Sequence, residues 1–149
     1  MTQEQGGDEI RPSPSELLKR GYSEDEISHI YELGRLFLEN GEVRRAEAIF
    51  QGLTEIAPEF PAGWLGLSYV GIQNKNLDDA IFAARQALRL DPEFNEALLY
   101  LVCCLLSIGD YTTAGTYLGE LGEKIEGGAI THPNMIRFYK AQLMRYQNR

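Results

Sequence analysis

The sequence has few of the residues that metal sites and redox centres require. It contains two cysteines and two histidines in 149 residues. The cysteines, Cys103 and Cys104, are neighbours on a predicted helix, so their side chains point apart and cannot form an ordinary disulfide. Two thiols without a nearby histidine do not make a zinc site. We therefore expect no metal, no cofactor and a reducing compartment.

Catalytic motifs are also missing. His29 and His132 lie far apart, and neither has a nucleophile at a recognisable spacing. His29 sits beside Glu26 and Glu32 on a predicted helix, which is typical of a surface residue. No phosphate-binding loop, dinucleotide glycine motif or carboxylate-rich metal loop is present. The sequence predicts a protein that is not an enzyme.

The chain has no long hydrophobic run. No segment approaches the roughly 18 apolar residues of a membrane span. The first seven residues are polar and lack the apolar centre of a signal peptide. These absences predict a cytoplasmic protein with no membrane span.

Basic residues are scarce outside the C-terminal tail. The net charge is −8: residues 1–26 carry −4, residues 131–149 carry +4 without an acid, and the segment between carries −8. A nucleic-acid-binding protein needs a basic surface, so this body argues against such a partner. It suits basic or apolar polypeptides.

What the sequence does have is a spacing of 34 residues. Leu33-Gly34, Phe37, Ala46, Phe50 and Pro58 mark the first copy. The second and third copies follow at the same spacing, with Ser68, Ala80, Ala84, Ala87 and Pro92, then Leu98, Leu105, Gly109, Ala114 and Leu121. Small residues at the eighth and twentieth positions and proline near the end are the signature of tetratricopeptide (TPR) repeats.

This pattern predicts an all-α fold: a right-handed superhelix of three helix-turn-helix repeats between an N-terminal and a C-terminal helix. Residues 1–12 are polar and predicted to be disordered. A helix is expected to begin at Ser13 and end at Gly21. Residues 13–149 form one predicted domain, with repeats at about 27–60, 61–94 and 95–128 and a capping helix at about 133–147.

The first helix of each repeat should line the concave face of the stack. Its groove-facing positions are mostly apolar or aromatic, and an exposed apolar strip normally marks a binding surface. We therefore predict a protein or peptide ligand. The alternative is that the chain's own N-terminal segment or C-terminal helix fills the groove. The predicted peptide-binding residues are Tyr31, Arg35, Leu38, Leu65, Tyr69, Ile72, Leu99, Cys103 and Leu106.

One common TPR ligand does not fit. Repeats that capture the C-terminal Glu-Glu-Val-Asp of large chaperones use a Lys/Asn/Arg clamp on its carboxylates. The clamp positions here hold Tyr31, Arg35, Gly66, Glu96 and Tyr100. One cation offset by one acid argues against a carboxylate clamp.

Three segments resemble the class II chaperones of bacterial type III secretion. Residues 46–53, AEAIFQGL, resemble the family's Ala-Glu-x-Ile-Phe-Gln-x-Leu run, and residues 64–68, WLGLS, are similar to its aromatic-Leu-Gly-Leu-Gly segment. Residues 96–106, ending in Cys-Leu-Leu, are loosely similar to its third repeat. The likeness covers about residues 24–126. The family's proline-rich lead into repeat three is absent.

The resemblance implies a cytoplasmic bacterial chaperone that holds a hydrophobic translocator subunit before export. Such chaperones bind an extended client segment in the concave groove through spaced apolar and proline anchors. Carried over, this assigns peptide contact to Tyr31, Leu38, Leu65, Tyr69 and Leu99. Many members dimerise through the N-terminal region, which here implies a homodimer through residues 13–39.

Two other functions remain open from the sequence. One is a needle-subunit chaperone or another component of the secretion apparatus with the same repeats. The other is a general TPR interaction scaffold in envelope or pilus assembly.

Overall fold

The computed structural model describes residues 21–149, which form seven α-helices and no strand. The predicted disorder of residues 1–12 and the predicted helix from Ser13 lie outside the described residues. Within residues 21–149, no helix is long and apolar enough to cross a membrane. In chain order the helices are α2 (Glu24–Glu39), α3 (Val43–Ile56), α4 (Pro61–Gln73), α5 (Leu77–Leu90), α6 (Asn95–Ile108), α7 (Tyr111–Glu126) and α8 (Pro133–Gln147).

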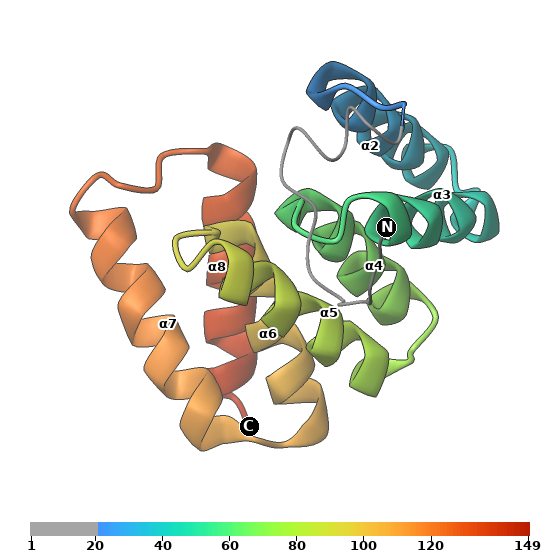
Figure 1. Ribbon diagram of the computed structural model, residues 1–149. Helices are drawn as coiled ribbons and strands as arrows, with labels where there is room; N and C mark the ends of the chain where they lie inside the picture. Colours follow the sequence, from blue (N-terminus) through green and yellow to red (C-terminus); the bar gives the residue numbers. More distant parts are fainter. Residues whose placement is uncertain (1–20) are drawn as a thin grey trace, which may run out of the picture.

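The helices form a stack of hairpins, as the repeat pattern predicted. Helices α2 and α3, α4 and α5, and α6 and α7 pack as pairs, and each pair packs on the next (Figure 1). Helix α8 packs against both α6 and α7 and closes the C-terminal end. The all-α repeat fold is therefore confirmed.

The 34-residue period is visible in the backbone of the turns. Gly41, Lys75 and Gly109 all have left-handed backbones, with φ of +78°, +58° and +85°. In each turn the next N–H donates to a carbonyl five residues earlier, at 2.8, 2.8 and 2.9 Å. Glycine adopts this conformation without steric cost, whereas lysine does so only under constraint. The same turn is thus kept in the second repeat although its glycine is missing.

Small residues allow close helix packing in the first two repeats. Phe50 of α3 is fully buried, and its ring lies between Gly34 of α2 and Gly66 of α4. A Cβ at Gly34 would lie 2.5 Å from that ring, and one at Gly66 would lie 2.6 Å from it. Side-chain carbons need about 3.5–4.0 Å. The glycines therefore create the space that Phe50 fills.

The second repeat adds a buried hydrogen bond to this packing. Ser68, fully buried on α4, donates its hydroxyl to the carbonyl oxygen of Ala80 on α5 at 2.9 Å. The third repeat has Val102 at the corresponding position, also fully buried. Its helices α6 and α7 make fewer close backbone approaches than the other two pairs. Valine takes more room at this position than serine or glycine, which fits the smaller number of close approaches.

Helix α8, the predicted capping helix, docks on the third repeat through apolar side chains. The Tyr139 and Tyr146 rings pack on the largest core cluster, which α6 and α7 contribute. Their hydroxyls occupy the space beside Gly122 and Gly115, where a Cβ would lie 2.7 and 2.6 Å away. The packing of Tyr146 in the space beside Gly115 thus offsets the low helix propensity of this glycine.

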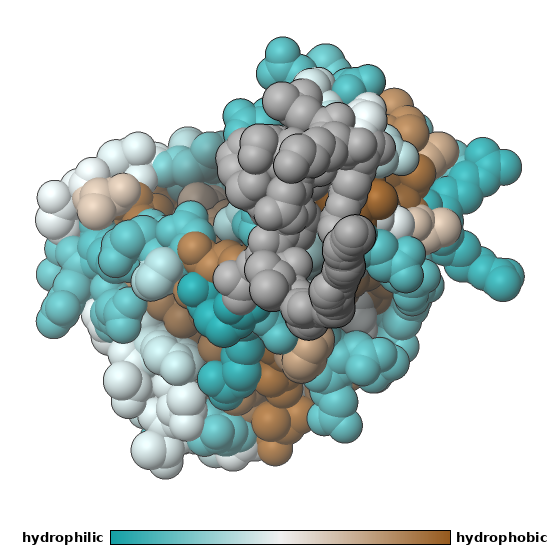
Figure 2. All heavy atoms as spheres, viewed as in Figure 1, coloured by the Kyte–Doolittle hydropathy of each residue, from teal (hydrophilic) through white to brown (hydrophobic). Residues whose placement is uncertain are grey.

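Apolar side chains are not confined to the core. Figure 2 shows a mostly hydrophilic face with separate apolar patches, one of them at the lower edge of the molecule. The large apolar residues that remain exposed are Leu33, Leu36, Phe82, Ile108, Tyr111 and Met144.

Candidate functional site

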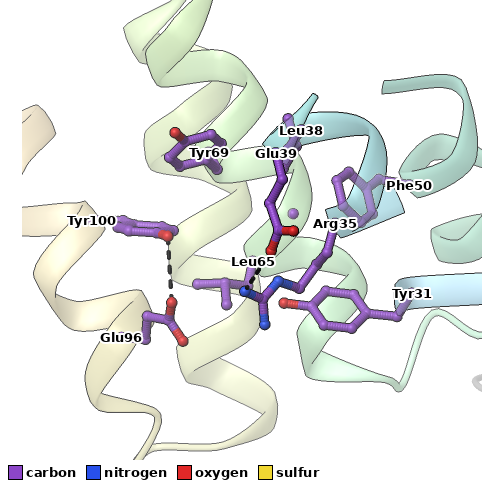
Figure 3. A pocket seen from close by; sticks show the side chains of 10 residues that line it. Tyr31, Arg35, Leu38, Glu39, Phe50, Leu65, Tyr69, Glu96 and Tyr100 are labelled. Carbon is purple, nitrogen blue, oxygen red and sulfur yellow. Dashed lines mark hydrogen bonds and ion pairs between the residues drawn. The ribbon is translucent and has the colours of Figure 1, made fainter. Parts of the chain in front are cut away.

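A cleft opens between the first helices of the three repeats, α2, α4 and α6. Its volume is about 210 Å³, and Figure 3 shows side chains from all three helices around it. The lining residues are Tyr31, Arg35, Leu38, Glu39, Phe50, Leu65, Gly66, Tyr69, Glu96 and Tyr100. We call this the concave cleft.

The concave cleft brings together five of the nine predicted peptide-binding residues. Tyr31, Arg35 and Leu38 come from successive turns of α2, and Leu65 and Tyr69 come from one face of α4. Leu65 is only 3% exposed, so it forms the floor of the cleft, whereas Tyr31, Leu38 and Tyr69 are half-buried. Whether these residues contact a peptide stays a prediction.

Aromatic rings form two groups along the cleft. Tyr31 packs against Phe50 and Phe60, with ring centroids 5.8 and 6.2 Å apart. Tyr69 packs against Tyr100, at 5.8 Å. Tyr100 in turn contacts Phe138 of α8 edge-on, at 6.0 Å. Such contacts hold each ring in place, so the apolar surface is present before any ligand arrives.

Charges in the cleft largely offset one another. Arg35 pairs with Glu39 at 3.5 Å, and both side chains are at least half exposed. Glu96 accepts a long hydrogen bond of 3.4 Å from the Tyr100 hydroxyl. It has no ion pair among the described residues. The cleft therefore carries one unpaired carboxylate.

The hydroxyls of Tyr31 and Tyr100 are neutral at physiological pH. Burial, reinforced by Glu96 and opposed by Arg35, raises the pKa of Tyr31 from 10.0 to about 12. Burial and Glu96 also raise the pKa of Tyr100. Neutral hydroxyls can donate and accept hydrogen bonds beside their apolar rings. This combination fits the backbone and apolar side chains of a polypeptide.

The other four predicted residues lie outside the concave cleft. Leu99 is 2% exposed within the core cluster of α6, α7 and α8, so the expected strip is interrupted there. Cys103 contacts the guanidinium of Arg145 on α8, with Sγ and Nη1 3.6 Å apart. Leu106 lines a separate recess beside α8, and Ile72 is half-buried away from the cleft.

Tyr100 and Glu96 were not among the predicted peptide-binding residues, although both line the cleft. The repeat spacing selected Leu99, one residue earlier than Tyr100. Glu96 and Tyr100 both stand at positions of the carboxylate clamp. A half-buried tyrosine next to a buried leucine on the same helix lines the cleft, and the tyrosine itself was the available signal in the sequence.

Nothing in residues 21–149 resembles a metal centre, because no group of three or more histidine, cysteine, aspartate or glutamate side chains is placed to hold an ion. What the cleft offers is a preformed surface of aromatic rings, leucines and neutral hydroxyls. That surface is suited to binding.

Stacked helical hairpins with a cleft on their concave side define a helical-repeat protein of the kind built for binding. The sequence profile described as Tetratricopeptide repeat matches residues 31–85 and 78–124. The chain therefore belongs to the tetratricopeptide repeat family.

Two curated relatives share part of the sequence. The peroxisomal targeting signal receptor of Saccharomyces cerevisiae is 31% identical over 94 residues, 62% of this chain. That of Kluyveromyces lactis is 32% identical over 91 residues, 60% of this chain. The match spans only 15% and 16% of these relatives' own length.

Solved structures share the fold across most of the chain. The type III secretion translocator chaperone SycD of Yersinia enterocolitica has a TM-score of 0.72 at 19% identity, covering 89% of this chain and 96% of that one. A type III secretion complex from Aeromonas hydrophila gives 0.71 at 18%, covering 87% and 84%. The TPR2AB domain of yeast Sti1, in complex with pHSP90, gives 0.71 at 14%, covering 89% and 52%.

Proposed function

We propose that this chain is a chaperone that binds an extended apolar segment of a protein client in the concave cleft. The observation that carries the proposal is the cleft's lining, in which Tyr31, Tyr69 and Tyr100 surround Leu38 and Leu65. The rings can pack on apolar side chains while their hydroxyls bond to the client's backbone. Covering the segment would keep an aggregation-prone client soluble.

The binding free energy expected from the apolar anchors is adequate for reversible binding. Each apolar anchor that the cleft buries contributes roughly 1.5–3 kcal/mol before ordering costs. Two or three anchors along an extended segment would give a complex that forms in the cell and releases its client on demand. The preformed rings reduce the ordering cost on the chaperone's side.

The finer proposal is that the client is a translocator-type subunit, held in the bacterial cytoplasm before type III secretion. The likeness of residues 46–53 to the class II chaperones supports it. So does the extent of the structural likeness to SycD, which spans nearly all of both chains.

The electrostatics of the cleft disfavour capture of a terminal carboxylate. Among the described residues that line the cleft, Arg35 alone is basic, and Glu39 already pairs with it. Glu96 would repel a ligand carboxylate in the same space. An internal, apolar client segment meets no such repulsion.

The other candidate functions differ in what they would bind. A client helix that fills the cleft would favour a needle-subunit chaperone, and a permanent membrane-associated complex would favour an assembly scaffold.

The predicted homodimer through residues 13–39 is supported by α2, where Leu33 and Leu36 are 42% and 51% exposed. Residues 13–20 of that segment lie outside the described residues.

The test is a calorimetric titration with a synthetic extended peptide that carries spaced leucine and proline anchors. Tyr69→Glu places a carboxylate in the apolar cleft and should abolish binding. Tyr111→Glu changes a 39% exposed tyrosine outside the cleft and serves as the matched control. Leu65 is unsuitable for this test, because it is 3% exposed and a charge there would disrupt folding.

The same pair of variants should be co-expressed with a translocator subunit from the host genome. The proposal expects the client to co-purify with the wild type and with Tyr111→Glu but not with Tyr69→Glu. If the folded Tyr69→Glu variant binds both peptide and client normally, the concave cleft is not the client site.

A further inference from the structure

A second cleft lies on the other side of α4, between α3 and α5. Its volume is about 200 Å³. Helix α4 separates the two clefts: Leu65 and Tyr69 line the concave cleft, whereas Trp64 and Leu67 line the second. We call this second site the convex cleft. Its lining residues are Glu47, Gln51, Trp64, Leu67, Val70, Gly71, Asn74, Asn76, Asp79, Phe82 and Ala83.

The sequence of α4 fits a helix that serves two clefts. It reads PAGWLGLSYVGIQ, has no charged residue, and is apolar on all sides rather than along one stripe. A helix buried on one side only would carry polar residues on its outer face. Here the outer face is occupied by Trp64 and Leu67, which the client site does not use.

An aromatic pair forms one end of the convex cleft. Trp64 and Phe82 meet edge to face, with ring centroids 6.1 Å apart. The indole N–H of Trp64 donates to the carbonyl oxygen of Pro58 at 2.9 Å, which fixes the orientation of the ring. Phe82 is 56% exposed. An ordered aromatic pair that stays open to solvent in a concavity is typical of a binding site.

The charge of the convex cleft has one sign. Glu47 and Asp79 line it, and no basic residue does so within residues 21–149. Asp79 accepts a hydrogen bond from the Asn76 amide at 2.8 Å, and Glu47 accepts one from Gln51 at 3.4 Å. Neither carboxylate forms an ion pair within the described residues. The concave cleft differs, because it contains Arg35.

We propose that the convex cleft binds a second polypeptide segment, one in which an apolar side chain is closely followed by lysine or arginine. The apolar side chain would cover the Trp64–Phe82 pair, and the cation would reach Glu47 and Asp79. A purely apolar segment would desolvate the two carboxylates without compensation, and an acidic segment would be repelled. The proposal uses a different surface from the concave cleft and does not rest on it.

Trp64 makes this site directly observable, because it is the only tryptophan in the chain. It lines the convex cleft and not the concave one. The emission of Trp64 should therefore report a ligand in the convex cleft specifically.

The experiment titrates the full chain with three ten-residue peptides of a glycine-serine background. Each carries two leucines four positions apart, followed by lysine, by glutamine or by glutamate. The lysine peptide should shift the Trp64 emission and bind at least about fivefold more tightly than the glutamine peptide, with a preference that declines as salt is added. The glutamate peptide should bind most weakly.

Matched variants assign the effect to the cleft. Glu47→Gln with Asp79→Asn should weaken the lysine peptide about fivefold, since two partly exposed ion pairs are lost. Glu55→Gln with Asp78→Asn removes two exposed acids from the same helices outside the lining and should change nothing. Phe82→Ala should weaken all three peptides, and Tyr69→Glu should leave the Trp64 response intact.

The proposal is overturned if no peptide changes the Trp64 emission, if the lysine and glutamine peptides bind equally, or if the two acid-removing pairs of substitutions have equal effects. Loss of the Trp64 response in Tyr69→Glu would also overturn it, because the ligand would then occupy the concave cleft. Circular dichroism of each variant establishes that the fold is retained.

Discussion

Replacing Gly66 by alanine tests how the repeats hold the concave cleft in shape. The new Cβ would lie 2.6–2.7 Å from three atoms of the Phe50 ring. The ring cannot retreat, because it is fully buried and Gly34 approaches it from the other helix. Overpacking of this kind costs about 1–3 kcal/mol. Alanine regains about 0.5–1 kcal/mol of helix propensity.

The net expectation is that Gly66→Ala lowers the free energy of unfolding by about 0–2.5 kcal/mol. Gly52→Ala is the matched control, because Gly52 lies in helix α3 and a Cβ there would meet nothing within 4 Å. That variant should be stabilised by about 0.5–1 kcal/mol. Urea titrations followed by circular dichroism measure both values.

A third variant separates overpacking from other effects. In a Phe50→Leu background the side chain is smaller, so the added cost of Gly66→Ala should fall or change sign. The two substitutions should therefore be coupled, as expected for residues in contact. If Gly66→Ala is as stable as Gly52→Ala, the reasoning about the Phe50 ring is wrong.

Three further predictions concern buried polar groups. Ser68→Ala should lower the free energy of unfolding by about 1 kcal/mol, because the hydrogen bond to the Ala80 carbonyl is lost; urea titration checks this value. Because the pKa of Tyr31 is raised, its neutral hydroxyl contributes in full to the free energy of unfolding below pH 10.0. That contribution is lost as the pH rises to about 12, since only the unfolded chain ionises readily in that interval. Tyr31→Phe should therefore reduce the loss of stability over this range, and an unchanged slope would contradict the assignment. Burial raises the pKa of the Cys104 thiol to about 12, so iodoacetamide should modify the partly exposed Cys103 first, which mass spectrometry of the native protein would show.

The fold was predictable because its signals are local and periodic. Asn40-Gly41, Asn74-Lys75 and Gly109-Asp110 are turn-forming pairs, and each lies between the two helices of one repeat. The small residues Gly34 and Ala46, which mark the repeat in the sequence, are both buried where the helices pack closely. What the period could not supply is the partner of each small residue, such as the Phe50 ring between Gly34 and Gly66.

The candidate site was predictable only in part. Tyr31 and Tyr69 follow from the repeat positions, but position five of the third copy is Leu99, which is buried in the core, while Tyr100 lines the cleft. The set of residues that face the cleft changes from one repeat to the next, so a fixed position number fails. The repeat spacing also gives no sign that Arg145 and Phe138 of α8 contact α6, because these contacts join residues that lie far apart in the sequence.

The convex cleft was not anticipated at all. Trp64 belongs to a segment that resembles the class II chaperones, whereas Phe82 stands at no signature position of the repeat. They come together because α4 and α5 pack closely. The one available signal of this cleft in the sequence was Phe82, a large apolar residue in the second helix of a repeat, where it is 56% exposed.

The central claim is that an extended apolar client segment occupies the concave cleft. The most direct measurement is an NMR titration of the chain, with isotope-labelled tyrosine rings, by the leucine- and proline-anchored peptide. Of the eight tyrosines, Tyr31, Tyr69 and Tyr100 should shift, whereas Tyr111 and Tyr117 should not. Binding that shifts Tyr111 or Tyr117 while the three cleft tyrosines stay unchanged would contradict the account.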